Sequence, residues 1–231
     1  PHFQSLRQNQ LSQGLPLSGK KVLITAGPTY EAIDPVRFIG NHSSGLMGFE
    51  LAKAAANLGA DVYLVTGPTH LSIAHDNIHV VKVVSGEDMY HSAQMYFDNS
   101  DIVICAAAVA DYRPKSVAEQ KIKKSDENFT IELVKNKDIL KTFGEHKKNQ
   151  YLVGFALETE NEVANAMGKL KRKNLDAIVL NSMRDKGAGF GGTTNKISFI
   201  DTNSTITTFE LKTKADVAVD IFNEIIKRRY A

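Results

Sequence analysis

The sequence has few of the residues that mark secreted or membrane proteins. Its 231 residues include one cysteine, Cys105, and no tryptophan. A single cysteine excludes an intrachain disulfide and any metal site built from several cysteines, and it suits a reducing compartment. No apolar run approaches the ~20 residues of a membrane span, and residues 1–18 lack the apolar centre of a signal peptide. We therefore expect a cytoplasmic protein without a membrane partner.

The chain also lacks a strong excess of either charge. Its formal net charge is +2, and the basic residues gather locally, as at Lys121–Lys124 and Lys227–Arg229. So small an excess does not predict a nucleic-acid partner. The hydrophobic fraction of 42% is typical of a globular domain with a core of its own.

Residues 1–18 differ in composition from the rest of the chain. They are rich in glutamine and serine and show little hydrophobic periodicity. We interpret them as a linker or an expression remnant, and we expect residues 19–231 to form one domain.

Strand-like and helix-like patterns alternate from residue 21 onward. We expect strands at 21–26, 61–66, 78–84, 102–109, 151–157 and 176–181, and helices at 44–58, 86–97, 161–173 and 214–229. Such apolar strands separated by helices are typical of a parallel sheet covered on both faces. The sequence thus predicts a Rossmann-like, doubly wound α/β fold. Alternation within 121–134 and a hairpin at 195–211, turning at 201–204, predict antiparallel strands that flank the parallel core.

The first strand is not followed at once by the glycine fingerprint of dinucleotide-binding proteins. It runs into "TAGPT" at 25–29, and the next glycine-rich stretch, "NHSSGLMG" at 41–48, opens a helix. A helix amino terminus at the carboxyl edge of a parallel sheet binds anions, so Ser43, Ser44 and Gly45 are candidates for a phosphate site. Residues 28–40 would form a loop above it. Alternatively, the serines only cap the helix and the glycines only allow close packing.

The inserted loop and the segment after the fourth strand carry further candidates. Arg37 and Asn41 could orient a carboxylate or a phosphate, although a solvated loop would carry the same residues. Asp111 follows the small residues Ala106–Ala108, and Lys121 lies on a basic loop that could close over a triphosphate. A solvated basic loop is the alternative there. The stretch "GAGFGG" at 187–192 is either another mobile closure or a flexible connection.

An oxidoreductase that uses NAD(P) is the main competing interpretation. Its fingerprint needs an acidic residue at the end of the second strand to hold the ribose, where this chain has Thr66 and Gly67. No Tyr-x-x-x-Lys pair is present to donate a proton. An NAD(P)-dependent reductase therefore stays the second candidate, and a non-catalytic nucleotide-binding module the third.

Several long motifs together resemble one enzyme family. "ITAGPTYEAIDPVRFIGNHSSGLMG", "AAAVADYRP…KIKK", "VKNKDIL", "VGFALET" and "KRKNLDAIVLN" occur in the order seen in phosphopantothenoylcysteine synthetase. The resemblance runs from about Leu17 to the carboxyl end and is to the bacterial CTP-using phosphopantothenate–cysteine ligase. That form is commonly the carboxyl-terminal half of a bifunctional flavoprotein with a decarboxylase.

The resemblance implies a two-step ligation and a set of site residues. 4′-Phosphopantothenate would react with CTP, with Mg²⁺ present, to give an acyl-cytidylate and pyrophosphate, and L-cysteine would then displace CMP. It implies no particular metal ligands, but it does imply a homodimer whose active sites are completed near the subunit contact. We expect catalytic roles for Asn41, Lys121 and Arg37. The implied CTP site, with the helix start included, comprises Ser43, Ser44, Gly45, Cys105, Ala106, Ala107, Asp111, Lys121, Lys137, Asp138, Ile139, Leu140, Phe155, Lys169 and Lys173.

One position departs from the family pattern. The bacterial motif usually reads "KNPD", whereas this chain has Lys137 at the proline position. The backbone of this turn can therefore differ from that of the family. Lys169 and Lys173 lie four residues apart on an expected helix, so they share one face and could jointly contact phosphate or simply face solvent.

Overall fold

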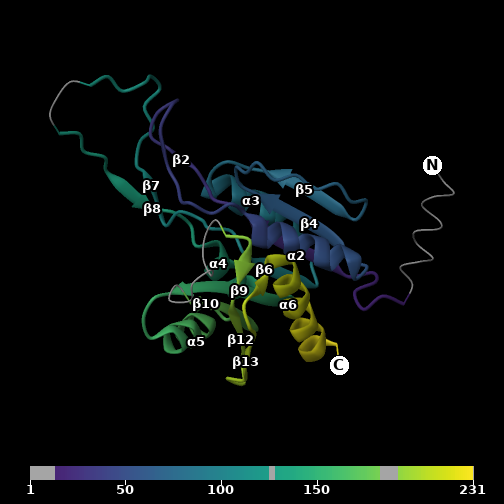
Figure 1. Ribbon diagram of the computed structural model, residues 1–231. Coiled ribbons are helices and arrows are strands. Elements are labelled where there is room, and N and C mark those ends of the chain that lie inside the picture. The colour runs from purple at the N-terminus through teal and green to yellow at the C-terminus, as the bar shows by residue number, and fades with distance from the viewer. Residues whose placement is uncertain (1–13, 125–127, 183–191, 231) are drawn as a thin grey trace.

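An eight-stranded sheet forms the centre of the computed structural model, which describes residues 14–124, 128–182 and 192–230 (Figure 1). Six neighbouring strands run parallel, and two antiparallel strands extend one edge. In spatial order they are β13 (Ile206–Thr208), β12 (Ile197–Asp201), β10 (Ala177–Ser182), β9 (Tyr151–Glu158), β6 (Ile102–Cys105), β1 (Lys21–Ala26), β4 (Asp61–Thr66) and β5 (Ile78–Lys82).

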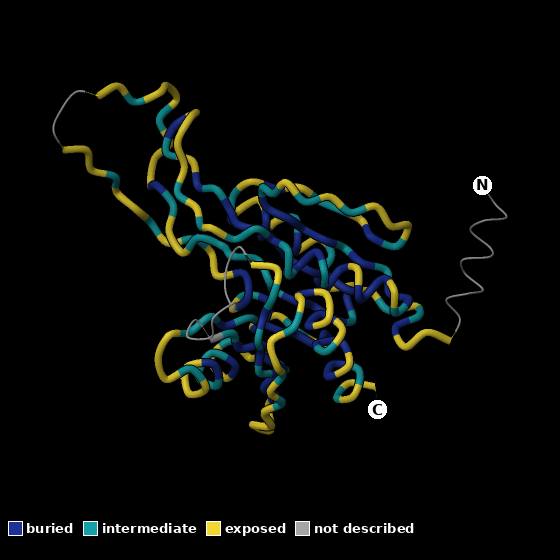
Figure 2. Tube along the Cα trace, in the orientation of Figure 1, coloured by how far each residue is buried: buried dark blue, intermediate teal, exposed yellow. Residues whose placement is uncertain are grey.

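Helices cover both faces of this sheet. Successive side chains of a strand point to opposite faces, so Leu23 and Ile24 of β1 belong to different hydrophobic clusters. Figure 2 shows the central strands and the inner helix faces as buried. The predicted doubly wound α/β fold is therefore confirmed. Helices α2 (Leu46–Asn57) and α6 (Lys214–Arg229) lie on one face, and α3 (Gly86–Phe97), α4 (Ile139–His146) and α5 (Glu162–Arg172) on the other.

Strand order reverses beside β1, which has β4 on one side and β6 on the other. The carboxyl ends of β1 and β6 separate at this point, which is where open α/β sheets place their ligands. The predicted hairpin of β12 and β13 is confirmed: Ser204, in the left-handed region with φ 63°, donates to the carbonyl of Asp201.

Two predictions about strands were wrong. The strand expected at 102–109 ends at Cys105, because its partner β1 ends at Ala26 and Gly27 turns away with φ 77°. A single bridge between Pro28 and Ala108 continues the pairing. The segment at 121–134 does not flank the core either, since its strand pairs outside the main sheet.

Two short ribbons form a projection that we call the arm, made of residues 28–40 and the described part of 112–135. In Figure 1 the arm extends away from the sheet, and Figure 2 shows it as mostly exposed or partly buried. The backbone N–H of Ala118 donates to the carbonyl of Ile33 and joins the two ribbons. The ribbons are β2 (Glu31–Ala32) with β3 (Phe38–Ile39), and β7 (Tyr112–Pro114) with β8 (Leu133–Lys135).

A third ribbon, β11 (Thr194–Asn195) with β14 (Lys212–Thr213), leads into α6. At the other end of the described chain, Leu17 is fully buried and its N–H donates to the carbonyl of Leu58. The domain boundary at residue 19 stays a prediction, since residues 1–13 lie outside the described part, as do residues 187–191 of the glycine-rich stretch. Within the described ranges, every helix is too short or too polar to cross a bilayer.

Candidate functional site

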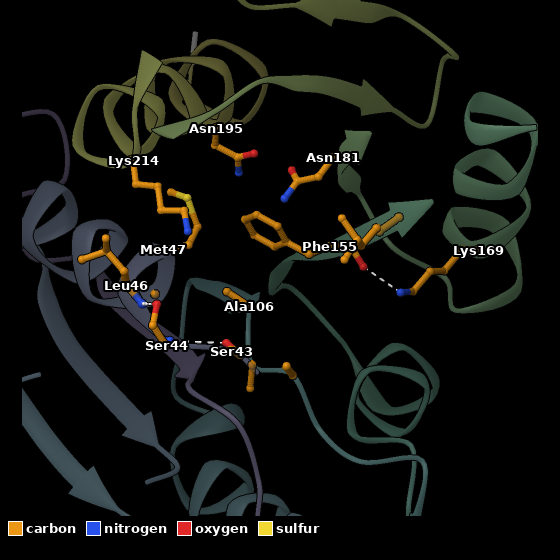
Figure 3. Close-up of a pocket in the computed structure, with 16 residues that line it drawn as sticks. Ser43, Ser44, Leu46, Met47, Ala106, Phe155, Lys169, Asn181, Asn195 and Lys214 are labelled. Carbon is orange, nitrogen blue, oxygen red and sulfur yellow. Dashed lines mark hydrogen bonds between the residues drawn. The ribbon is translucent and has the colours of Figure 1, made fainter. Parts of the chain in front are cut away.

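Two adjoining cavities open at the carboxyl edge of the sheet. The first, which we call the central cavity, has a volume of about 290 Å³, and the second, the α4 cavity, about 180 Å³. They share Ala107, Phe155 and Lys169 in their walls. The central cavity is lined by Ser43, Ser44, Gly45, Leu46, Met47, Gly48, Ala106, Ala107, Ala108, Phe155, Ala156, Leu157, Lys169, Asn181, Asn195 and Lys214 (Figure 3). The α4 cavity is lined by Thr25, Cys105, Ala107, Val109, Ala110, Asp111, Asn136, Lys137, Asp138, Ile139, Leu140, Phe155, Lys169 and Lys173.

The amino terminus of α2 forms one wall of the central cavity. Gly48 allows its close approach, since a Cβ there would lie 2.4 Å from the Cβ of Ala26 on β1. The N-cap is Gly45, with φ 82°, and no side chain caps the helix. Ser43 and Ser44 instead accept from the N–H groups of Gly45 and Leu46, at 3.3 and 3.4 Å. The capping interpretation of the serines is therefore wrong, and first-turn N–H groups remain for a ligand.

Charged side chains from α4 and α5 meet in the α4 cavity. Lys173 Nζ lies 2.8 Å from Asp138 Oδ2, and Asp138 also accepts from the N–H of Lys141 as the N-cap of α4. Burial opposes ionisation of Asp138, but these hydrogen bonds prevail and lower its pKa. Lys169 Nζ donates to the carbonyl of Phe155 at 2.6 Å. Desolvation and the nearby Lys173 lower the pKa of Lys169.

Cys105 contributes volume rather than reactivity. Desolvation by the surrounding protein raises the pKa of its thiol to about 12, although the hydroxyl of Thr25 opposes this effect. The thiol is therefore protonated at neutral pH and is a poor nucleophile. Cys105 lines the α4 cavity together with Ala107, one of the small residues that follow this strand.

Lys137, the residue at the family's proline position, contacts an aromatic ring of a neighbouring helix. Lys137 precedes the N-cap Asp138, and its Nζ lies 3.9 Å from the ring centroid of Tyr90 on α3. This distance is within the range of a cation–π contact. The expected site residues Ile139 and Leu140 follow it directly and line the cavity.

Asn41 connects two walls of the site. Its Nδ2 donates to the carbonyl of Ala108 at 2.5 Å, and its Oδ1 accepts from the N–H of Ser43 at 3.0 Å. The side chain thus ties the loop after β6 to the start of α2, beside the central cavity. Asp111, exposed at the α4 cavity, is also placed as expected.

The structure does not bring Arg37 and Lys121 to these cavities. Both line a separate hollow on the arm, of about 670 Å³. Arg37 forms an ion pair with Asp34 and donates to the carbonyl of Ile122 at 2.9 Å. Within one chain, Arg37 therefore holds the arm together.

Three polar residues of the central cavity were not predicted from the sequence: Asn181, Asn195 and Lys214. Asn181 could have been predicted, because it stands at the carboxyl end of a parallel strand, where open α/β sheets place their ligands. Lys214 could also have been noticed, because it stands in the first turn of a helix, where the helix dipole disfavours a positive charge.

The fold defines a Rossmann-like α/β domain, and its two cavities form a candidate ligand site at the strand switch point. The chain belongs to the family described as "DNA/pantothenate metabolism flavoprotein C-terminal domain", whose model matches residues 17–229. The resemblance to this group of proteins is thus confirmed.

Two curated relatives and one solved structure illustrate the similarity. The Coenzyme A biosynthesis bifunctional protein CoaBC of Bacillus subtilis is 48% identical over 210 residues, covering 91% of this chain and 52% of that protein. A protein of an unknown prokaryotic organism, named "Cysteine/Cysteine sulfinic acid decarboxylase", is 52% identical over 212 residues, covering 91% of this chain and 59% of that protein. The chain therefore spans about half the length of these relatives. The crystal structure of the C-terminal domain of CoaBC matches with a TM-score of 0.80 at 42% identity, covering 93% of this chain and 98% of that chain.

Proposed function

We propose that this domain is a ligase that joins 4′-phosphopantothenate to L-cysteine with CTP, as a step of coenzyme A biosynthesis in the cytoplasm. The observation that carries the proposal is the pair of adjoining cavities, lined by lysines and a helix amino terminus, in a chain similar to CoaBC proteins. Two connected compartments suit a reaction in which a nucleotide must meet a second anionic substrate.

We assign the nucleoside to the α4 cavity. The flat walls of Ala107 and Phe155 suit a base or a ribose, and Asp111 and Asp138 offer acceptors to hydroxyl or amino groups. The phosphates then extend past Lys169 toward the amino terminus of α2, where N–H groups favour negative charge. In this proposed arrangement the α-phosphate would lie near the junction of the two cavities.

In the first step, a carboxylate oxygen of phosphopantothenate attacks the α-phosphorus of CTP. The bond from this phosphorus to the bridging oxygen of the β-phosphate breaks, and pyrophosphate leaves. Lys169 and the α2 amides stabilise the charge that develops on the phosphates. In the second step, the cysteine amine attacks the acyl carbon, the bond to CMP breaks, and the amine releases its proton to water.

Asn41 is suited to hold the acyl group during the second step. Its amide already fixes the loop after β6 against Ser43, so its position is set before the substrate binds. Asn41→Asp keeps the shape but loses the Nδ2 donor. We expect it to accumulate the acyl-cytidylate while amide formation falls by about 100-fold, as for the loss of one oxyanion donor. Mass spectrometry of quenched reactions measures both species, and unchanged turnover without intermediate would show the role to be wrong.

The described residues were searched for groups that could bind Mg²⁺. No group of three His, Cys, Asp or Glu side chains gathers among them. Mg²⁺ commonly binds through one or two carboxylates together with substrate phosphates, so a larger cluster of ligands is not required for it. When bound, the ion would supply neutralisation of phosphate charge.

We further propose a homodimer in which the arm of one protomer reaches the cavities of its partner. The arm carries Lys121, which the family resemblance assigns to the nucleotide, yet within one chain it lies at a separate hollow. It also exposes large apolar side chains, including Phe38, Tyr112 and Leu133. An exposed apolar projection of this kind is typical of an association surface.

Pyrophosphate release tests the function most directly. The protein is supplied with Mg²⁺, CTP and 4′-phosphopantothenate, with and without L-cysteine, and ATP and NADPH are run in parallel. We expect pyrophosphate with CTP and phosphopantothenoylcysteine only when cysteine is added. Nicotinamide turnover would favour a reductase, and nucleotide binding without product would favour a binding module.

A further inference from the structure

The segment that follows β6 forms a wall shared by both cavities. Residues 106–111, which we call the β6 loop, lie outside the helices and named strands, yet each of them lines the central cavity or the α4 cavity. The loop ends at Asp111, whose exposed side chain is the candidate for contact with the nucleoside. Because the loop lacks a strand ladder of its own, its backbone groups need other partners to hold them in place.

Thr29 holds one side of the β6 loop. It is the last residue of the "TAGPT" stretch after β1, and it is fully buried. Its Oγ1 accepts from the N–H of Ala110 at 3.0 Å, and its own N–H donates to the carbonyl of Ala108 at 3.3 Å. A fully buried hydroxyl has no surface to offer a ligand, so Thr29 can act on the site only through the loop.

Asn136 holds the other side of the loop, from the segment that leads into α4. Its Nδ2 donates to the carbonyl of Ala110 at 2.8 Å, and its Oδ1 accepts from Nη1 of Arg113 at 3.2 Å. Its backbone N–H donates to the carbonyl of Asp111 at 2.8 Å. A carboxamide carries a donor and an acceptor on one planar group, so neither a carboxylate nor an aliphatic side chain could make both side-chain bonds.

Together, the two side chains fix the backbone on which Asp111 stands. Thr29 engages the N–H of Ala110, and Asn136 engages its carbonyl. That carbonyl belongs to the peptide group before Asp111, and the carbonyl of the peptide group after it also accepts from Asn136. The Cα of Asp111 is therefore held from both sides. Since Asn136 lies two residues before Asp138, the N-cap of α4, the same contacts connect the two carboxylates of the α4 cavity.

We propose that Thr29 and Asn136 are positioning residues for the nucleotide, which act by holding Asp111 at the wall of the α4 cavity. The inference rests on the proposed function for the identity of the ligand. Asp111 is assigned to the nucleoside and not to the terminal phosphates, so binding of CTP and binding of CMP depend on the two residues to the same extent.

Isothermal titration calorimetry on the whole chain measures this effect without turnover. CTP and CMP are titrated into the wild type, Thr29→Val, which keeps the shape but loses the acceptor, and Asn136→Ala. Loss of one neutral hydrogen bond corresponds to about 3–10-fold in an equilibrium constant. We expect each variant to bind both nucleotides more weakly by about that factor. Affinities equal to those of the wild type, or a loss for CTP that spares CMP, would overturn the proposal.

A further substitution shows whether the two residues act through Asp111. Asp111→Ala removes the carboxylate, and the effects of Thr29→Val and Asn136→Ala are measured again in that background. If the two residues position Asp111, neither substitution weakens CTP binding further once the carboxylate is gone. A loss that adds in full to that of Asp111→Ala contradicts the proposal, because the two residues would then act by another route.

Matched variants separate positioning from general damage. Thr29→Ser keeps the Oγ1 acceptor and should recover most of the affinity that Thr29→Val loses. Thr208→Val also removes a hydroxyl hydrogen bond, the one of 3.2 Å with Ser198 Oγ on the β12–β13 hairpin, and should bind both nucleotides as the wild type does. Asn136 is only partly buried, so Asn136→Ala decides the matter if Thr29→Val does not fold.

The outcomes also distinguish this inference from the proposed function. A wild type that binds CTP but forms no phosphopantothenoylcysteine overturns the ligase, whereas a loss of affinity that depends on Asp111 supports the positioning role in the same protein. A wild type that forms the product and binds CTP no more tightly than the two variants overturns the positioning role alone. A wild type that binds neither nucleotide overturns both.

Discussion

At the scale of single residues, Asp34 determines how the arm is held together. Its side chain is buried, and its carboxylate accepts from the N–H groups of Val36, Arg37 and Ile122 as well as from the Arg37 guanidinium. Hydrogen bonding by Arg37, against the opposing effect of burial, holds the pKa of Asp34 well below its ordinary value of 3.8. One carboxylate thus joins both segments of the arm.

Asp34→Asn tests this role. The native state favours the ionised carboxylate, so its stabilising effect is complete above pH 3.8 and is lost as the pH falls through the native pKa. We expect the variant to show about tenfold faster amide exchange at Val36, Arg37 and Ile122 at neutral pH. The wild type should keep its protection at those amides down to about pH 4, as NMR exchange measurements can show. Equal exchange in both proteins would contradict this account.

Single residues also show what the sequence could reveal about the site. Ser43, expected at a helix amino terminus, and Asp111, expected just past a strand, do line the cavities, and Asn41 of the inserted loop lies beside them. Lys214 was not predicted, because its neighbours in the cavity come from β10 and β11. A local sequence pattern does not show which distant segments are brought together by the fold. Arg37 was expected to orient a carboxylate or a phosphate, whereas in the structure it forms an ion pair with Asp34 on the arm.

At the scale of elements, the long apolar strands and helices were predictable, and the short ones were not. Helix α6 spans the predicted residues, because its apolar spacing is regular over sixteen positions. Helix α4 has eight residues and was not predicted, since so short a segment carries little periodic signal. The strands β7 and β8 have three residues each, and their pairing outside the sheet depends on contacts that no local pattern specifies.

Helix α4 contains a glycine that sets its distance from the end of α5. A Cβ on Gly144 would lie 1.8 Å from the carbonyl oxygen of Lys173, and Asn174 Nδ2 donates to the Gly144 carbonyl at 2.8 Å. This close approach helps to place Lys173 beside Asp138 in the α4 cavity. Both helices must separate if Gly144 acquires a side chain.

We expect Gly144→Ala to lower the free energy of unfolding by about 2–3 kcal/mol, since the clash is with backbone atoms. It should also weaken CTP binding through displacement of Lys173. Gly168→Ala in α5 is the matched control, because a Cβ there meets only the flexible end of Arg172. That variant should be stabilised by about 0.5–1 kcal/mol. Urea denaturation measures both, and equal stability of the two variants would count against the packing argument.

At the scale of the whole molecule, the arm separates one group of site residues from the other. The sheet and its helices place Asn41, Phe155 and Lys169 at the two cavities, whereas Lys121 and Arg37 lie on the projection. A doubly wound fold could be predicted from the alternation of strands and helices. The direction of the arm could not be predicted, because few of its residues are buried against the rest of the chain. The partner that we propose for the arm is a second chain, which one sequence does not show.

Complementation between variants tests whether two chains share each site. Asn41→Asp and Lys121→Ala should each be nearly inactive in amide formation when purified alone. If the arm serves the partner's cavities, a mixed dimer holds one site with both defects and one with neither. Random exchange of equal amounts should then restore on the order of one quarter of wild-type activity.

The same experiment contains its own control. Leu133→Asp places a charge on the exposed face of the arm and should shift the protein to a monomer in analytical ultracentrifugation, with product formation lost. A mixture in which one variant also carries Leu133→Asp should recover less activity than the original mixture. If each site is instead built within one chain, the mixed dimer keeps one defect in each site and no activity returns after exchange. That result, with an intact dimer, would place Lys121 in the site of its own chain and require the arm to fold back toward Lys169.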